Sequence, residues 1–156
     1  DVTGVGLNYR MSEIGAALGC VQMEKLDTIL KKRKQNFNRL RGLLSGVPDI
    51  VVLDSYDESL ESSHYCLIAV LKGKYRGARD RIILELKRRE LGTSIYYPKP
   101  VPAMDYYKKK YNTKPGSYPN ASEISGNSIA FPVGPHLNLS DMKRIYENFS
   151  EILGEI

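Results

Sequence analysis

The segment that decides the fold opens with "GLNYRMSEIGAALG" (residues 6–19). Ser12 is a suitable helix N-cap, and Glu13 suits the positive end of a helix dipole. Apolar residues then recur at near-helical spacing, and the first proline comes only at Pro48. These positions are Ile14, Leu18, Val21, Leu26, Ile29 or Leu30, the apolar stem of Arg33, Phe37, Leu40 and Leu44. The pattern predicts one helix over residues 12–44, which at 1.5 Å per residue would be roughly 50 Å long.

A helix of that length would project beyond its own domain, because a compact domain of this size has a diameter near ~40 Å. Gly15 and Gly19 lie one turn apart on one face, although each helical glycine costs about 1 kcal/mol relative to alanine. Small residues on a helix face let another backbone come close, so we expect the N-terminal part to pack against something else. The alternative is that both glycines are tolerated and have no role.

Two hydrogen-bonding side chains, Asn8 and Arg10, stand just ahead of the expected helix. The N–H groups and the dipole at a helix N-terminus favour negative charge. Arginine also makes bidentate contacts with phosphate or carboxylate groups. This entrance therefore indicates a phosphate or carboxylate contact. The alternative is that Arg10 pairs with a local acid, either Glu13 or Asp1.

The rest of the chain alternates between short strand and helix patterns. Apolar, β-branched and aromatic content predicts strands over residues 50–53, 64–73, 93–98 and 128–132. Helices are expected over residues 78–91 with Gly92 as the stop, near 104–109, over 121–126, and over 140–154 with Ser140 as the cap. The last helix carries an apolar stripe of Met142, Ile145, Phe149 and Ile152. This order predicts an α+β fold in which helices cover a small sheet.

The composition is that of an ordinary globular protein: 42% of the 156 residues are hydrophobic and 26% are charged. No apolar run approaches the ~20 residues needed to cross a bilayer, so we expect no membrane span. The net charge of +5 includes two basic runs, residues 31–34 and 108–110. Without a known nucleic-acid-binding module, we interpret these runs as solvated faces rather than as a nucleic-acid site. The chain lacks an initiator methionine, which suggests a fragment or a processed chain.

The cysteines and histidines give little sign of chemistry. Cys20 and Cys66 both stand among apolar residues, so we expect buried free thiols, as in a cytoplasmic protein. His64 and His136 are isolated, and a lone histidine is more often structural than catalytic. No group of cysteines, histidines and acids has the spacing of metal ligands, so no metal site is expected.

Three segments together resemble a known family. They are "GLNYRMSEIGAALGCVQMEKLDTILKKRKQNFNRL" (6–40), "LKRRELGTSIYYPKPVP" (86–102) and "SYPNASEISGNSIAFPVGPHLNLSDMKRIYENFSEIL" (117–153). They resemble, in register, the later part of the DegT/DnrJ/EryC1/StrS family. These are pyridoxal-phosphate-dependent nucleotide-sugar aminotransferases with the aspartate-aminotransferase fold, known as fold type I. The resemblance implies that this chain is the C-terminal portion of such an enzyme, with a role in amino-sugar or polysaccharide biosynthesis.

The resemblance also implies partners and site residues. The family is homodimeric, with active sites at the subunit interface, and takes a nucleotide sugar and an amino donor such as glutamate. Asn8 and Arg10 match the residues that reach the neighbouring subunit's cofactor phosphate. Tyr96, Tyr97 and Lys99 fall in the loop near the nucleotide sugar. Residues 1–45 would belong partly to a cofactor domain and the dimer interface, and residues 46–156 would form the small C-terminal α/β domain.

The sequence departs from the family pattern in several places. The family's Schiff-base lysine lies upstream, and no lysine here matches its motif, so we expect no catalytic residue in this chain. Tyr96 replaces the usual histidine before the "YP" pair, Pro102 replaces another histidine, and Gly15 stands where a polar residue is usual. Two alternatives stay open. One is a sugar dehydratase on the same scaffold, and the other is a binding or regulatory module that is not an enzyme.

Overall fold

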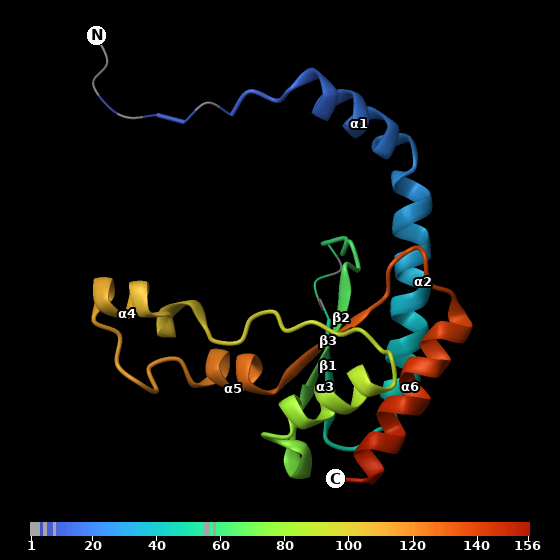
Figure 1. Ribbon diagram of the computed structural model, residues 1–156, viewed down its shortest axis with the longest axis vertical. Coiled ribbons are helices and arrows are strands. Elements are labelled where there is room, and N and C mark those ends of the chain that lie inside the picture. Colours follow the sequence, from blue (N-terminus) through green and yellow to red (C-terminus); the bar gives the residue numbers. More distant parts are fainter. Residues whose placement is uncertain (1–3, 5, 8, 55–56, 58) are drawn as a thin grey trace.

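The computed structural model describes residues 4, 6–7, 9–54, 57 and 59–156. In chain order the elements are α1 (Glu13–Glu24), α2 (Leu26–Leu44), β1 (Ile50–Leu53), β2 (Cys66–Leu71), η1 (Gly73–Tyr75), α3 (Arg79–Arg88), η2 (Val101–Ala103), α4 (Asp105–Tyr111), α5 (Pro119–Asn127), β3 (Ser128–Pro132) and α6 (Leu139–Gly154). Figure 1 shows a small sheet beside α2, α3 and α6, with α1 and α4 reaching away from this centre. The mixed α+β architecture agrees with the sequence-based expectation.

The sheet of the described residues is antiparallel, in the order β1-β2-β3. β2 is central and carries the sequence "CLIAVL", and most of its residues are buried. In the hydrophobic core, the Phe131 ring of β3 packs edge to face against the Phe149 ring of α6, with 5.1 Å between the ring centroids. The apolar stripe expected on the last helix is confirmed, because Met142, Ile145, Phe149 and Ile152 are all buried. The core therefore forms between the sheet and the buried faces of α2, α3 and α6.

The prediction of a single helix over residues 12–44 is wrong in one respect: the helix is interrupted at Lys25, between α1 and α2. There the backbone N–H of Lys25 bonds to the Gln22 carbonyl at 3.1 Å, three residues back, and α1 and α2 meet at an angle (Figure 1). Ser12 caps α1 as expected, since its hydroxyl accepts from the Gly15 N–H at 3.2 Å. Lys25 lies ahead of the buried part of α2, so no core packing holds the junction straight.

α1 itself has no buried residue, whereas α2 buries Asn36, Phe37, Leu40 and Leu44. Ile14 of α1 is 84% exposed and Leu18 is 63% exposed. Cys20 is exposed too, so the expectation of a buried thiol is wrong there, and Cys66 is half-buried. The environment of α1 explains the error: the apolar neighbours of Cys20 have nothing to pack against within the described chain.

Two expected helix boundaries move by a few residues. α3 ends at Arg88, and Glu90, rather than Gly92, takes the left-handed conformation after it, with φ of 60°. Asn138, rather than Ser140, caps α6. Its side-chain oxygen accepts from the Ser140 and Asp141 N–H groups at 2.8 and 3.2 Å. The Asp141 carboxylate accepts in return from the Asn138 N–H, which completes a capping box.

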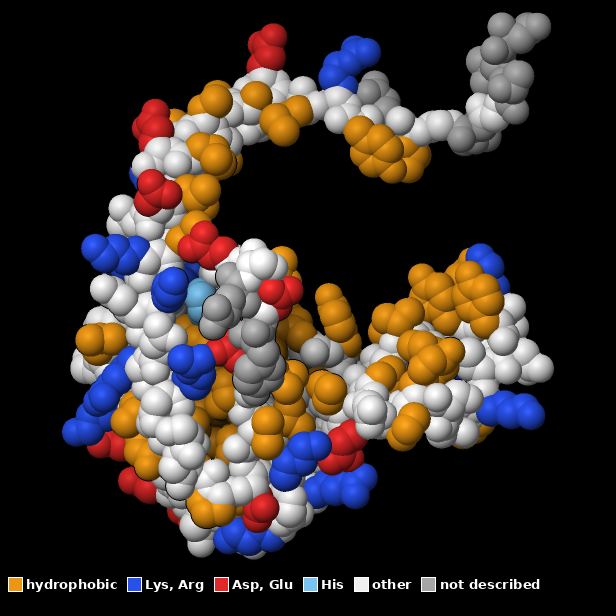
Figure 2. Space-filling view, turned by 180° about the vertical axis from the view of Figure 1, so that it is seen from behind, with side chains coloured by type: hydrophobic (Ala, Val, Ile, Leu, Met, Phe, Trp, Pro, Cys, Tyr) orange, Lys and Arg blue, Asp and Glu red, His pale blue; other side chains and the backbone are white. Residues whose placement is uncertain are grey.

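The strand expected over residues 93–98 is reduced to a single bridge between Ser94 and Ala130. Beyond it the proline-rich chain leaves the sheet and forms a projecting segment, residues 98–118, which we call the arm. The arm contains η2 and α4, so the helical turn expected near 104–109 is confirmed. Figure 2 shows hydrophobic side chains gathered on this projection. Among the described residues, no helix combines the length and apolar character needed to cross a bilayer.

Candidate functional site: a cleft at the sheet edge

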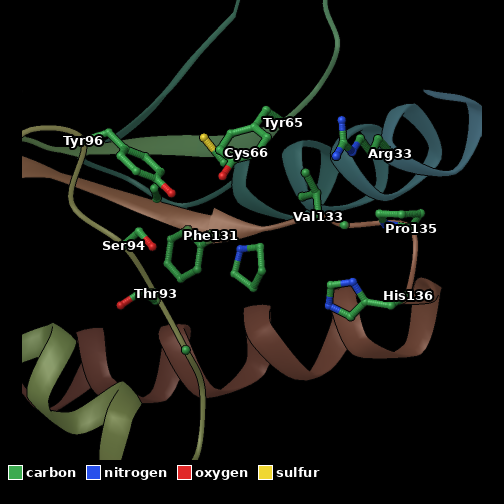
Figure 3. A pocket seen from close by; sticks show the side chains of 14 residues that line it. Arg33, Tyr65, Cys66, Thr93, Ser94, Tyr96, Phe131, Val133, Pro135 and His136 are labelled. Carbon is green, nitrogen blue, oxygen red and sulfur yellow. The ribbon is translucent and has the colours of Figure 1, made fainter. Parts of the chain in front are cut away.

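A cleft of about 280 Å³ opens where β2, β3 and α2 converge. We call it the sheet-edge cleft, and Figure 3 shows it with Arg33 of α2 at one end and Tyr96 at the other. Its polar or ionisable lining side chains are Arg33, Tyr65, Cys66, Thr93, Ser94, Tyr96 and His136. They come from four separate parts of the sequence, so the fold has to bring them together.

One wall of the cleft is the loop that follows β3, and Asn36 holds it. Asn36 is only 2% exposed, and its side-chain Nδ2 lies 3.0 Å from the Gly134 carbonyl oxygen and 3.1 Å from that of Leu137. A third carbonyl, of Val133, lies at 3.4 Å. A buried amide satisfied in this way ties the loop to α2. Arg33 lies three residues before Asn36 on the same helix, so the same contact sets the loop beside Arg33.

The opposite wall is the segment that carries Tyr96. Ser94 and Ala130 exchange backbone hydrogen bonds of 3.0 and 2.9 Å, which fasten this segment to β3. Two residues later, the Tyr96 ring lies 6.2 Å from the Tyr65 ring. A hydrogen bond with Tyr96 raises the pKa of the Tyr65 hydroxyl, and the Tyr96 charge adds to the effect. The Tyr65 hydroxyl therefore stays protonated around neutral pH.

The charge in the cleft is positive. Arg33 lies over the Tyr65 ring, with 5.7 Å between the guanidinium carbon and the ring centroid. Its Nε is buried and makes no hydrogen bond to any described residue. No carboxylate is among the described residues that line the cleft. A buried donor without an acceptor is costly, and an anionic or oxygen-rich ligand would satisfy it.

Gly134 and His136 are in close contact on the loop wall. A Cβ added at Gly134 would lie 2.6 Å from His136 Cε1, well inside contact distance. The absence of a side chain at this position lets the imidazole fold against the loop and line the cleft. Burial raises the pKa of the neighbouring Cys66 thiol, which keeps that thiol protonated.

The residues singled out from the sequence are not all brought together. Tyr96 lines the cleft, whereas Tyr97 and Lys99 are exposed and are not among its lining residues. Arg10 is exposed on the segment ahead of α1 and is not among the residues that line the cleft. Asn8 lies outside the described residues. The expected substrate role of Tyr97 and Lys99, and the expected phosphate role of Asn8 and Arg10, stay predictions.

The sequence reasoning missed Arg33, Ser94 and Tyr65 as site residues. One feature of the sequence could have indicated Arg33. Its apolar stem continues the apolar face of α2, but a charged guanidinium is not expected in a hydrophobic core. Ser94 and Tyr65 had none, since each sits beside a strand and only the strand pairing places it. Among the described residues, no group of three or more histidines, cysteines and acids could hold a metal ion.

Comparison with known proteins identifies the family of this chain. The model of the DegT/DnrJ/EryC1/StrS aminotransferase family matches residues 1–150. The chain belongs to this family. The resemblance drawn from the sequence is thereby confirmed, together with the fold type I architecture that it implied.

Similar curated relatives are named as aminotransferases or biosynthesis proteins. The UDP-4-amino-4-deoxy-L-arabinose–oxoglutarate aminotransferase of Shewanella sediminis is 31% identical over 99% of this chain and 41% of its own length. The spore coat polysaccharide biosynthesis protein SpsC of Bacillus subtilis is 25% identical over 98% of this chain and 39% of its own length. The chain therefore spans about two fifths of the length of these relatives.

Solved structures of aminotransferases have the same fold. The putative sugar aminotransferase Spr1654 of Streptococcus pneumoniae, solved in a PLP form, is 28% identical with a TM-score of 0.83 over 94% of this chain and 36% of its own. Helicobacter pylori PseC, an aminotransferase involved in the biosynthesis of pseudoaminic acid, superposes with a TM-score of 0.84 at 23% identity, over 100% of this chain and 41% of its own. The PseC match supports the fold alone.

Proposed function

We propose that this chain is the C-terminal portion of a pyridoxal-phosphate-dependent aminotransferase that acts on nucleotide-linked keto sugars. The observation that carries the proposal is the family match over residues 1–150, together with relatives named for UDP- and dTDP-linked amino sugars. The amino donor would be glutamate. The catalytic lysine would come from a part of the protein that precedes this segment in the relatives.

The entrance of α1 suits the phosphate of pyridoxal phosphate. Arg10 is exposed two residues before the N-cap Ser12, and the first turn of α1 presents backbone N–H groups and the positive end of the helix dipole. Arg10 would bind phosphate oxygens through its guanidinium, and Asn8 would donate beside it. When bound, the cofactor supplies an electron sink and a carrier for the amino group.

The sheet-edge cleft would form one wall of the sugar pocket. Tyr96 and Tyr65 present hydroxyls, and Arg33 presents a buried N–H that needs an acceptor. These groups would orient the hydroxyls or the phosphate of the substrate and exclude water from that side. Tyr97 and Lys99 would contact the substrate farther out, because both side chains are exposed.

The homodimer belongs to the proposal as well. The exposed apolar side chains of α1 include Ile14, Leu18 and Val21, and nothing lies within 4 Å of a Cβ built at Gly19. A partner subunit or the cofactor domain would cover this face. Residues 1–45 would then link the two domains, and residues 46–156 would form the small domain.

The test compares the 156-residue protein with a longer protein that includes the upstream portion. Each is given pyridoxal phosphate, glutamate and a UDP- or dTDP-linked keto sugar. We expect amino-sugar formation only by the longer protein, because this chain has no lysine that matches the family's lysine motif. Turnover by the 156-residue protein alone would disprove this division of roles. A deoxygenated product without an amino group would identify a dehydratase instead.

Arg10→Ala in the longer protein tests the cofactor contact. We expect faster loss of pyridoxal phosphate on dialysis, measured by absorbance, because a charged phosphate contact is removed. Arg39→Ala, an exposed arginine on α2, is the matched control and should retain the cofactor. Equal retention by the two variants would exclude Arg10 from the phosphate site.

A further inference from the structure

The arm concentrates positive charge and aromatic rings in one short segment. Residues 98–118 contain five lysines and one aspartate, so they carry +4 of the chain's net +5, and they also contain four tyrosines. No described carboxylate forms an ion pair with any of these lysines. Lys110 instead lies over the Tyr106 and Tyr111 rings, at 5.6 and 5.5 Å from their centroids. The positive charge of the arm is therefore not neutralised by the described carboxylates.

The arm also encloses a pocket, which is separate from the sheet-edge cleft. This arm pocket has a volume of about 170 Å³. Its polar or charged lining side chains are Lys108, Thr113, Lys114, Ser117, Tyr118 and Ser122. No residue lines both this pocket and the sheet-edge cleft. Two lysines, one tyrosine and several hydroxyl-bearing residues thus line one small cavity.

Local chain geometry builds the arm pocket. Asn112 ends α4 in the left-handed conformation, with φ of 48°, so that the chain turns back. The Thr113 hydroxyl then donates to the Pro102 carbonyl oxygen at 2.6 Å, which joins the two sides of the pocket. Pro100, Pro102 and Pro115 restrict the lining backbone. The pocket is therefore formed before any ligand arrives, which lowers the ordering cost of binding.

The size of the pocket limits what it can hold. The volume of about 170 Å³ is below the roughly 300–1,000 Å³ of pockets that bury a drug-sized ligand. That is enough for a diphosphate group or a single ring, but not for a whole nucleotide sugar. Paired lysines are typical partners of phosphate oxygens, and the face of Tyr118, a side chain that is 48% exposed, suits the stacking of a base.

We infer that the arm pocket binds the nucleoside diphosphate part of a nucleotide-linked ligand. Lys108 and Lys114 pair with the diphosphate, and the base lies against Tyr118 at the rim. The inference rests on the proposed function, because it assigns part of the nucleotide-sugar substrate to residues outside the sheet-edge cleft. The sugar itself lies beyond the pocket.

Isothermal titration of the 156-residue protein with UDP and with dTDP tests the inference. We expect saturable binding that pyrophosphate displaces and that added salt weakens. The double variant Lys108→Ala/Lys114→Ala should weaken UDP binding roughly tenfold or more, because charge-assisted hydrogen bonds are lost. Tyr118→Ser should weaken it also, whereas Tyr118→Phe should keep the affinity within about twofold, because the ring remains.

A matched pair of lysines controls for overall charge. Lys32→Ala/Lys87→Ala removes the same charge from exposed positions on α2 and α3. The inference is overturned if UDP does not bind saturably, if both double variants weaken UDP binding equally, or if orthophosphate alone binds as well as UDP. Binding of anionic phospholipid vesicles that depends on the arm lysines, without UDP binding, would assign the arm to a membrane surface and would also overturn it.

The longer protein separates the two proposals. There, Lys108→Ala/Lys114→Ala should raise the KM for the nucleotide sugar about tenfold and leave the KM for glutamate unchanged. An active aminotransferase whose nucleotide-sugar KM is unaffected by this variant would overturn the arm pocket but not the proposed function. UDP binding at the pocket in a protein that transaminates no keto sugar would overturn the proposed function but not the arm pocket.

Discussion

The Asn36 side chain donates to the Gly134 carbonyl oxygen at 3.0 Å, across 98 positions of sequence. This contact joins α2 to the loop after β3, and it lies beside the sheet-edge cleft. Asn36 is a polar residue on the buried face of an amphipathic helix, next to Phe37. Its amide is tolerated there because backbone carbonyls of the loop accept from it. The position couples the stability of the domain to the shape of the cleft.

Asn36→Ala should therefore destabilise the protein. The substitution leaves the carbonyls of Val133, Gly134 and Leu137, which are buried or partly buried, without their donor. We expect a loss of about 1–3 kcal/mol in the free energy of unfolding. Urea denaturation followed by circular dichroism measures it. Asn38→Ala, two residues along the same helix at an exposed position, should change the free energy of unfolding by less than about 0.5 kcal/mol. Equal losses in the two variants would show that the buried hydrogen bonds are not what holds the loop.

Gly134→Ala should move the His136 ring out of the cleft. The new methyl group would lie 2.6 Å from His136 Cε1, so the imidazole has to rotate or the loop has to shift. The chain has only two histidines, so NMR signals of the His136 ring can be followed with His64 as an internal reference. We expect a large change at His136 and almost none at His64.

Gly46→Ala is the control for that experiment, because nothing lies within 4 Å of a Cβ built at Gly46. It should leave both histidine spectra unchanged. Adding His136→Ala to Gly134→Ala should recover any stability that the single glycine variant loses, because the clash is removed. An unchanged His136 spectrum in Gly134→Ala would mean that the ring is not held against the loop.

The fold could be predicted from the sequence where the apolar residues of a periodic pattern all pack against one core. The stripe on α6 is such a case, because Met142, Ile145 and Phe149 recur at helical spacing and all face one core. Helix ends were harder. Asn138 and Ser140 are both good caps, and only the reciprocal contact with Asp141 decides between them. The break at Lys25 could not be predicted, because the local sequence continues as helix and the change comes from where packing begins.

The site was less predictable than the fold. The sheet-edge cleft combines α2, the start of β2, the segment after α3 and the loop after β3. Tyr96 was identified only through the family resemblance, and Arg33 was identified only as part of a helix face. Their distance from one another along the chain leaves no local pattern to detect. The Ser94–Ala130 bridge and the Asn36 contacts, both long-range, create the arrangement.

The Cys66 thiol should react slowly in the folded protein. Burial raises its pKa, so at a given pH the reactive thiolate fraction is smaller than in the unfolded chain. In a Cys20→Ser variant, which leaves Cys66 as the single thiol, the rate of labelling by a disulfide reagent should rise with pH along a curve displaced to higher pH than in urea.

The same shift has a consequence for stability. The folded state binds the Cys66 proton more tightly, so the contribution of this group is present at pH values below its unfolded pKa and is lost as the pH rises through the folded pKa. Cys66→Ala in the Cys20→Ser background should therefore flatten the fall of stability on the alkaline side. Identical labelling curves in the folded and unfolded states would contradict a buried, protonated thiol.

α1 should contribute little to the stability of this domain and much to a larger assembly. Leu18 on α1 is 63% exposed, whereas Leu40 on α2 is fully buried. Leu40→Ala should cost about 2–5 kcal/mol in the free energy of unfolding of the 156-residue protein. Leu18→Ala is the matched substitution and should cost less than about 0.5 kcal/mol, since it removes no buried contact and alanine favours the helix.

In the longer protein, by contrast, Leu18→Ala should have a clear cost. If a partner subunit or the cofactor domain covers the apolar face of α1, Leu18→Ala there should weaken the dimer in sedimentation equilibrium, because apolar area that was buried against the partner is lost. Thr28→Ala, on a neighbouring exposed position of α2, serves as the control. A dimer unaffected by Leu18→Ala, or a comparable loss of stability in the 156-residue protein, would mean that α1 does not serve as an interface helix.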